Sequence, residues 1–139
     1  MLNFRLSFIP FIVLTVANFF ASWLWYSPIL FAKPWMKALG KDPQRTMSEA
    51  EKKQMPFLFV SGLLSSALLV YVMMVLVNSL NASSFLEGGL IGLVLWAGYA
   101  LTHSLNTLWE ERKAVVLVIN NGLFLLSYVA FGGILAIWK

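Results

Sequence analysis

The sequence predicts an all-α membrane protein: a four-transmembrane-helix bundle with an interfacial or cytoplasmic segment between the first two helices. Hydrophobic residues make up 60% of the 139 residues and charged residues only 12%, whereas roughly a quarter of the residues in a soluble domain are charged. The mean hydropathy is +0.79, and four apolar runs each reach the ~20 residues that a helix needs to cross a bilayer. We therefore expect residues 1–139 to form a single integral membrane domain. The predicted spans cover approximately residues 6–26, 56–79, 85–109 and 114–138, and the long connection covers residues 27–55.

The first predicted span ends in the stretch WYSPILFAKPWM, which begins at Trp25. Pro28 cannot donate a backbone hydrogen bond and disfavours helical geometry at Ser27, so the helix should stop there. Tryptophan and tyrosine suit the headgroup layer, because each ring has an apolar body and a polar group. We expect the segment after Pro28 to run along the membrane surface. The predicted interfacial anchors are Trp23, Trp25, Tyr26, Pro28, Trp35 and Trp109.

The end of the long connection carries a helix-start signal. Ser48 is followed three residues later by Glu51, which fits a capping box, where each side chain accepts a hydrogen bond from a backbone N–H of the other residue. This pattern predicts a short cytoplasmic helix over residues 48–55 that leads into the second span.

The third predicted span carries its polar and small residues on one narrow stripe. At 100° per residue, the intervals of three and four place these residues within an arc of about 80°. Polar groups that face hydrocarbon are costly unless they are paired, so the stripe should face the bundle interior or a partner subunit. Its members are Gly88, Gly92, Trp96, Tyr99, His103, Asn106 and Glu110.

Small residues at a spacing of four permit close helix contact. The third span has one such pair, Gly88 and Gly92, and the second span has two, Ser61 with Ser65 and Gly62 with Ser66. We expect these faces to pack against other helices, within the chain or in an oligomer.

Basic residues indicate how the bundle is oriented, because lysine and arginine in short connections are retained on the cytoplasmic side. The long connection holds six of them, and Arg112 and Lys113 lie between the third and fourth spans, which makes eight of ten. The opposite side receives only Arg5 and Lys139. We therefore expect both termini to be extracytoplasmic.

Two regions of the chain resemble a known family. WYSPILFAKPWMKALG, from Trp25 to Gly40, and NTLWEERKAVVLVINNGLFLLSYVAFGGILAIWK, from Asn106 to Lys139, are similar to motifs of the bacterial membrane-protein family catalogued as domain of unknown function 1761. With the similar length and layout, the resemblance covers nearly the whole chain. It implies a small multi-pass protein of the bacterial inner (cytoplasmic) membrane and brings no reaction or ligand. The positions most like its motifs are Tyr26, Pro28, Trp35, Asn106 and Asn121.

Polar residues of all four spans fall in the half that is predicted to be cytoplasmic. Two interpretations remain open: these groups hydrogen-bond across helices and fix their register, or they line a hydrated cavity in which His103 exchanges a proton or binds a solute. Glu110 lies at the end of its span, where a solvated carboxylate is the simpler interpretation. The candidate polar layer, or solute site, consists of His103, Asn106, Tyr99, Asn18, Ser22, Ser65, Asn120, Asn121 and Glu110.

Composition argues against several chemistries. The absence of cysteine excludes disulfides and thiolate sites, and a single histidine cannot supply three or four close metal ligands from one chain. No nucleophile or phosphate-binding motif is recognisable, so we expect no catalytic residues, no cofactor and no metal. The net charge of +4 comes from connections between spans and does not indicate nucleic acid.

Two functions from different classes fit these observations. The first is a transporter or channel-like oligomer that binds a small solute or ion at the polar layer. The alternative is a non-catalytic membrane scaffold or accessory subunit in which the polar layer is structural. In both cases the expected partners are the lipid bilayer, further copies of the chain in a homo-oligomer, and anionic lipid headgroups at the basic first connection.

Overall fold

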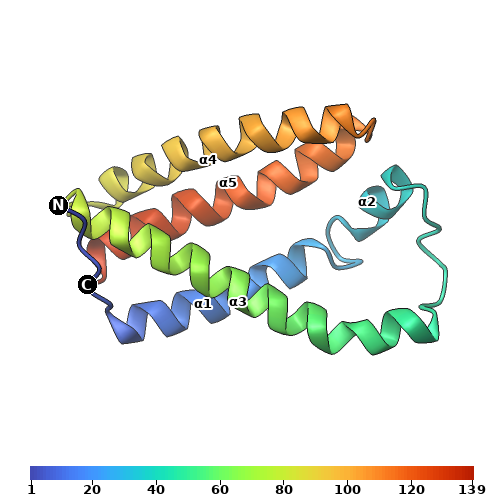
Figure 1. Ribbon diagram of the computed structural model, residues 1–139, viewed down its shortest axis with the longest axis horizontal. Helices are drawn as coiled ribbons and strands as arrows, with labels where there is room; N and C mark the ends of the chain where they lie inside the picture. The colour runs from blue at the N-terminus through green and yellow to red at the C-terminus, as the bar shows by residue number, and fades with distance from the viewer.

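The computed structural model describes residues 1–139, and it is entirely helical (Figure 1). Four of its helices are long and apolar enough to cross a membrane, which confirms the predicted fold class. The fifth is a short helix between the first two of them. The helices are α1 (Phe8–Trp25), α2 (Ala32–Ala38), α3 (Glu49–Ser79), α4 (Phe85–Trp109) and α5 (Ala114–Ile137).

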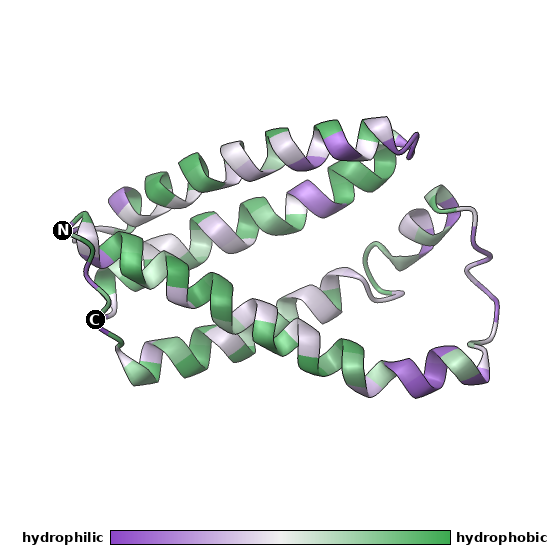
Figure 2. Cartoon of the chain, viewed as in Figure 1, coloured by the Kyte–Doolittle hydropathy of each residue, from purple (hydrophilic) through white to green (hydrophobic).

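The long helices form two pairs, with α1 against α3 and α4 against α5. Helix α3 also contacts α5 and so joins the pairs. Figure 1 shows both termini at one end of the molecule, with α2 and the connection between α2 and α3 at the other. Figure 2 shows that this connection and the start of α3 are the most hydrophilic part of the chain.

The WYSP stretch ends α1 as the sequence predicted. The helix stops at Trp25, and the Ser27 carbonyl then accepts hydrogen bonds from the N–H groups of Leu30 and Ala32, both at 3.1 Å. The Ser27 hydroxyl accepts a further bond from the Ile29 N–H at 3.3 Å, and Ser27 is buried. The turn therefore leads directly into α2, which packs against α5.

The second predicted span is only the later part of α3. We predicted a separate short helix over residues 48–55, but one helix runs from Glu49 through Pro56. The predicted capping box does form, with the Glu51 N–H 3.2 Å from Ser48 Oγ and the Ser48 N–H 2.9 Å from Glu51 Oε2. Arg45 also donates to Glu51, and this bond raises the pKa of the guanidinium. Pro56 lies inside α3 and removes one backbone hydrogen bond, and the helix continues past it into the apolar span.

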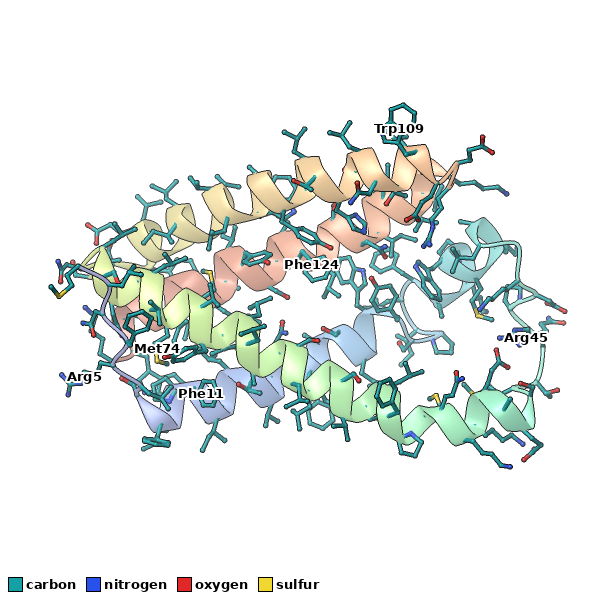
Figure 3. The ribbon with its side chains drawn as sticks, in the orientation of Figure 1. Arg5, Phe11, Arg45, Met74, Trp109 and Phe124 are labelled. Carbon is teal, nitrogen blue, oxygen red and sulfur yellow. The ribbon has the colours of Figure 1, made fainter.

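The apolar core lies at the end of the bundle that carries the termini. Val70, Met73 and Val77 of α3 are completely buried there, and they pack with Leu14 of α1 and Leu135 of α5. Figure 3 shows Phe11 and Met74 in the same region. This half of the molecule is a closed helical core.

Glycines bring α4 and α5 into close backbone contact. A Cβ on Gly92 would lie 2.5 Å from the carbonyl carbon of Tyr128, and one on Gly88 would lie 2.7 Å from that of Gly132. No side chain fits between the two helices at these points. The Gly88 and Gly92 face predicted from the sequence is therefore occupied within the chain, and an oligomer would have to use another surface.

Candidate functional site

A cavity of about 550 Å³ lies between α1, α3 and α5, next to the apolar core. Helix α1 lines it with Asn18, Phe19 and Ser22, and the turn after α1 contributes Tyr26 and Ser27. Its volume is within the ~300–1,000 Å³ range of small-molecule sites, which are likewise mostly apolar with a few placed polar groups. Helices α3 and α5 complete the wall with Phe59, Gly62, Ser65, Ser66, Leu69 and Leu123.

Asn18 is one of the buried polar residues of this cavity, with 5% of its surface exposed. Its side-chain Nδ2 donates to Ser66 Oγ at 2.9 Å, and its backbone carbonyl accepts from Ser22 Oγ at 2.9 Å. Its Oδ1 atom is buried and has no hydrogen-bond partner in the protein. A buried amide oxygen is costly to leave unpaired, so this atom is the point at which a ligand would gain most.

The small residues of α3 explain why α1 comes close enough to form this site. A Cβ on Gly62 would lie 3.3 Å from the Phe19 ring, and one turn later Ser66 meets Asn18. The predicted Gly62 and Ser66 pair is therefore the contact face for α1. Phe19 also meets Phe59 edge to face, with ring centroids 6.1 Å apart.

A second polar centre lies on α5, at Ile119 to Gly122. The indole Nε1 of Trp25 donates to the Ile119 carbonyl at 2.9 Å, and the Tyr26 hydroxyl lies 2.7 Å from Asn120 Oδ1. Gly122 leaves room for the indole, because a Cβ there would lie 3.1 Å from the Trp25 ring. The two family-like motifs, WYSP and INNG, thus bind each other across the bundle.

The same segment of α5 is also bonded to α4. Trp96 Nε1 donates to the Asn121 carbonyl at 2.8 Å, and Asn121 Nδ2 donates to Ser104 Oγ at 3.0 Å. Asn121 Oδ1 is buried without a partner. The segment from Ile119 to Asn121 is therefore an interhelical hub that connects α1, α5 and α4.

His103 lies in an aromatic cluster between α4 and α5. Its ring stacks on Tyr99, with centroids 5.3 Å apart and planes at 19°, and Tyr99 in turn contacts Phe124 at 4.7 Å. Figure 3 shows Phe124 near the middle of the bundle. The imidazole is half-buried, and its Nδ1 atom is enclosed without a hydrogen-bond partner. Of these three side chains, Phe124 lines the cavity, and Tyr99 and His103 do not.

The lower end of the predicted α4 stripe does not face the interior. Asn106 and Glu110 are exposed on the chain surface, and Glu110 pairs with Arg112 at 2.7 Å. The stripe is therefore interior only as far as His103. At this end the packed face of α4 runs instead through Ala100 and Thr107, which are buried, and through Ser104, which is bonded to Asn121.

The predicted anchors separate into two groups. Trp23 and Trp109 are 57% and 86% exposed, as a lipid-facing ring would be, and Figure 3 shows Trp109 pointing away from the bundle. Trp25 and Tyr26 instead donate hydrogen bonds to α5. Trp35 turns toward Tyr26, with centroids 5.4 Å apart, and its Nε1 is buried.

The polar residues do not form one layer at a single depth. Asn18 and Trp25 are seven positions apart on α1, or about 10 Å at 1.5 Å per residue, so the cavity amide and the Trp25 contact lie at different heights. Tyr26 connects them, because it lines the cavity and donates to Asn120. Ser22 and Ser65 belong to the cavity, whereas Asn120 and Asn121 belong to the hub. The sequence did not predict that Ser104 pairs with Asn121 or that Gly122 makes space for the Trp25 ring. For Gly122 the one available signal was its position beside two asparagines.

These observations define a helical membrane protein with four helices able to cross a bilayer and a cavity between three of them. No group of three or more His, Cys, Asp or Glu side chains comes together that could hold a metal ion. A family model described as "Protein of unknown function (DUF1761)" matches residues 9–136. The chain therefore belongs to the DUF1761 family, which confirms the resemblance seen in its motifs. No curated protein and no solved structure matches it.

Proposed function

We propose that this protein binds a small solute inside the membrane and acts as a carrier for it. The observation that supports this proposal is the cavity beside Asn18, where a largely apolar wall surrounds a buried amide with a free acceptor atom. The apolar core, which includes Leu14 and Val70, lies between this cavity and the end with the termini. A continuous ion path through one chain is therefore not favoured, and binding without catalysis agrees best with the lining.

Occupancy of the cavity can be tested with tritiated 1-dodecanol and the protein in nanodiscs. We expect saturable binding to the natural protein, measured as the counts that excess unlabelled dodecanol displaces. Ser65→Phe should remove at least nine-tenths of these counts, because Ser65 is exposed and lines the cavity, so a phenyl ring can fill the space. The matched control is Leu64→Phe on the adjacent exposed position outside the lining, which should bind normally. Equal binding by all three proteins would mean that the probe only partitions into lipid.

A second candidate function is a membrane scaffold or accessory subunit. The observation that favours it is the α5 hub, where Trp25, Tyr26 and Trp96 donate to groups of the same chain, as expected of structural polar contacts. Lys33, Lys37 and Lys41 are exposed, and the three ion pairs of the chain do not include them. These lysines are available to anionic lipid headgroups. A homo-oligomer belongs to either proposal and would use a surface other than the α4 glycines.

We also propose that the protein lies in the bacterial inner membrane with both termini extracytoplasmic. The basic connections support this orientation, and both termini lie at the same end of the bundle.

The orientation can be measured because the chain has no cysteine. Gln44→Cys and Ser83→Cys introduce single thiols at exposed positions of opposite connections. In intact cells an impermeant maleimide should label Ser83→Cys, and it should label Gln44→Cys only after the membrane is opened. The reverse pattern would invert the topology.

A further inference from the structure

We infer that the ligand of the cavity is a neutral amphiphile from the bilayer whose head carries an O–H or N–H donor. This inference rests on the proposed function and names the class of molecule that the site takes. Three features of the cavity support it: the absence of charged residues from the lining, the free hydrogen-bonding atoms, and the exposed rim.

The lining indicates a ligand without charge. None of the residues around the cavity is Asp, Glu, Lys, Arg or His. An ionised head placed there would lose its hydration without gaining an opposite charge, and the cost of burying an unpaired charge is far larger than that of a neutral polar group. A carboxylate, phosphate or ammonium head is therefore excluded from the deep part of the cavity.

The unpaired polar atoms of Asn18 and Ser22 in the cavity are hydrogen-bond acceptors, which favours a ligand with a donor. Asn18 Nδ2 is already bonded to Ser66 Oγ, so the amide offers only its free Oδ1, which accepts. The Ser22 hydroxyl uses its one hydrogen on the Asn18 carbonyl, which leaves its oxygen as another acceptor. A hydroxyl or amide N–H on the ligand would pair with Asn18 Oδ1, whereas an ether or ester head, which has no donor, would leave this buried acceptor unpaired.

The source of the ligand is indicated by the rim. Trp23 and Leu58 line the cavity and are 57% and 55% exposed, and both belong to helices that are long and apolar enough to cross a membrane. Phe19, Phe59 and Leu69 provide an apolar wall behind them. A chain-bearing molecule can enter from the hydrocarbon and keep its tail in apolar surroundings, whereas a short water-soluble alcohol would gain little from this wall.

Competition against tritiated 1-dodecanol tests the inference in the same nanodisc assay. Unlabelled 1-dodecanol should compete about tenfold better than methyl dodecyl ether, which has the same chain and no donor, since one hydrogen bond to a buried group is worth about that factor. Dodecanoate should compete more weakly still because it is charged. Butanol, with the donor and a short chain, should compete at least tenfold more weakly than dodecanol and so separate a bilayer source from a soluble one.

The role of Asn18 is tested with an apolar replacement of similar shape. Asn18→Leu should make the alcohol and the ether compete equally, because the acceptor is gone. The control Asn121→Leu also removes a partly paired amide, but one outside the cavity, and it should keep the tenfold preference. If Asn18→Leu does not fold, the preference of the natural protein decides the question alone.

The outcomes distinguish the inference from the function on which it rests. Absence of any saturable dodecanol binding would overturn both. Equal competition by alcohol and ether, with binding still abolished by Ser65→Phe, would overturn only the donor-bearing class and leave the cavity as a binding site. Stronger competition by dodecanoate, or by butanol, would likewise reject the neutral bilayer amphiphile.

Discussion

Gly92→Ala should strongly destabilise the protein. The new Cβ would lie 2.5 Å from the carbonyl carbon of Tyr128 and 3.0 Å from the backbone nitrogen of Val129, and backbone atoms cannot move aside as a side chain can. Helices α4 and α5 would have to separate. Overpacking of this kind costs about 3 kcal/mol, which should appear as a lower free energy of unfolding in an SDS titration followed by circular dichroism.

The control for this change lies on the same helix. A Cβ on Gly98 would have no atom within 4 Å, so Gly98→Ala should leave stability unchanged or raise it by up to about 1 kcal/mol through helix propensity. Similar losses from both substitutions would show that flexibility of α4, and not its approach to α5, is what the glycines provide.

Trp25→Phe is expected to lower the free energy of unfolding by about 2 kcal/mol. The substitution removes the indole N–H that bonds to the Ile119 carbonyl at 2.9 Å and leaves a void against Gly122. A lost hydrogen bond contributes about 1 kcal/mol, and the unfilled volume adds a similar amount. The same SDS titration measures the loss.

Trp109→Phe is the matched control for Trp25, because it makes the identical chemical change at a ring that is 86% exposed. Its effect on the free energy of unfolding should be within about 0.5 kcal/mol. If the two variants behaved alike, Trp25 would be a membrane anchor, as the sequence first suggested, and the hub on α5 would not hold the helices together.

The two ends of the bundle are held together by different kinds of contact. Close packing around Met73 and the glycine contact between α4 and α5 hold the end with the termini together. Toward the other end the contacts between helices are made increasingly by polar atoms, such as those of Asn18 and Tyr26. Fewer apolar contacts there leave room for the cavity.

Hydropathy and a few local signals were sufficient to predict the elements. The four apolar runs became four long helices, Pro28 marked the end of α1, and Ser48 with Glu51 marked the start of α3. These features depend on residues close together in the chain, where backbone geometry and burial in lipid act in the same way whatever the rest of the molecule does. The sequence did not predict that one helix continues through Pro56, because a proline inside a helical pattern usually marks the end of a helix.

The partners of each helix were decided only by the tertiary structure. A stripe on α4 predicts an inner face, but it cannot say that Gly92 meets Tyr128, or that near the end of α4 Thr107 is buried and Asn106 is exposed. Trp25 is a residue type typical of the headgroup layer. Here its indole donates to α5 instead, because Gly122, 97 positions later in the chain, leaves space for the ring. Periodicity gives the direction of a side chain around its own helix axis, whereas pairing and cavities depend on the distance and tilt between helices. Those are set by the fit of small residues that are remote from each other in the sequence.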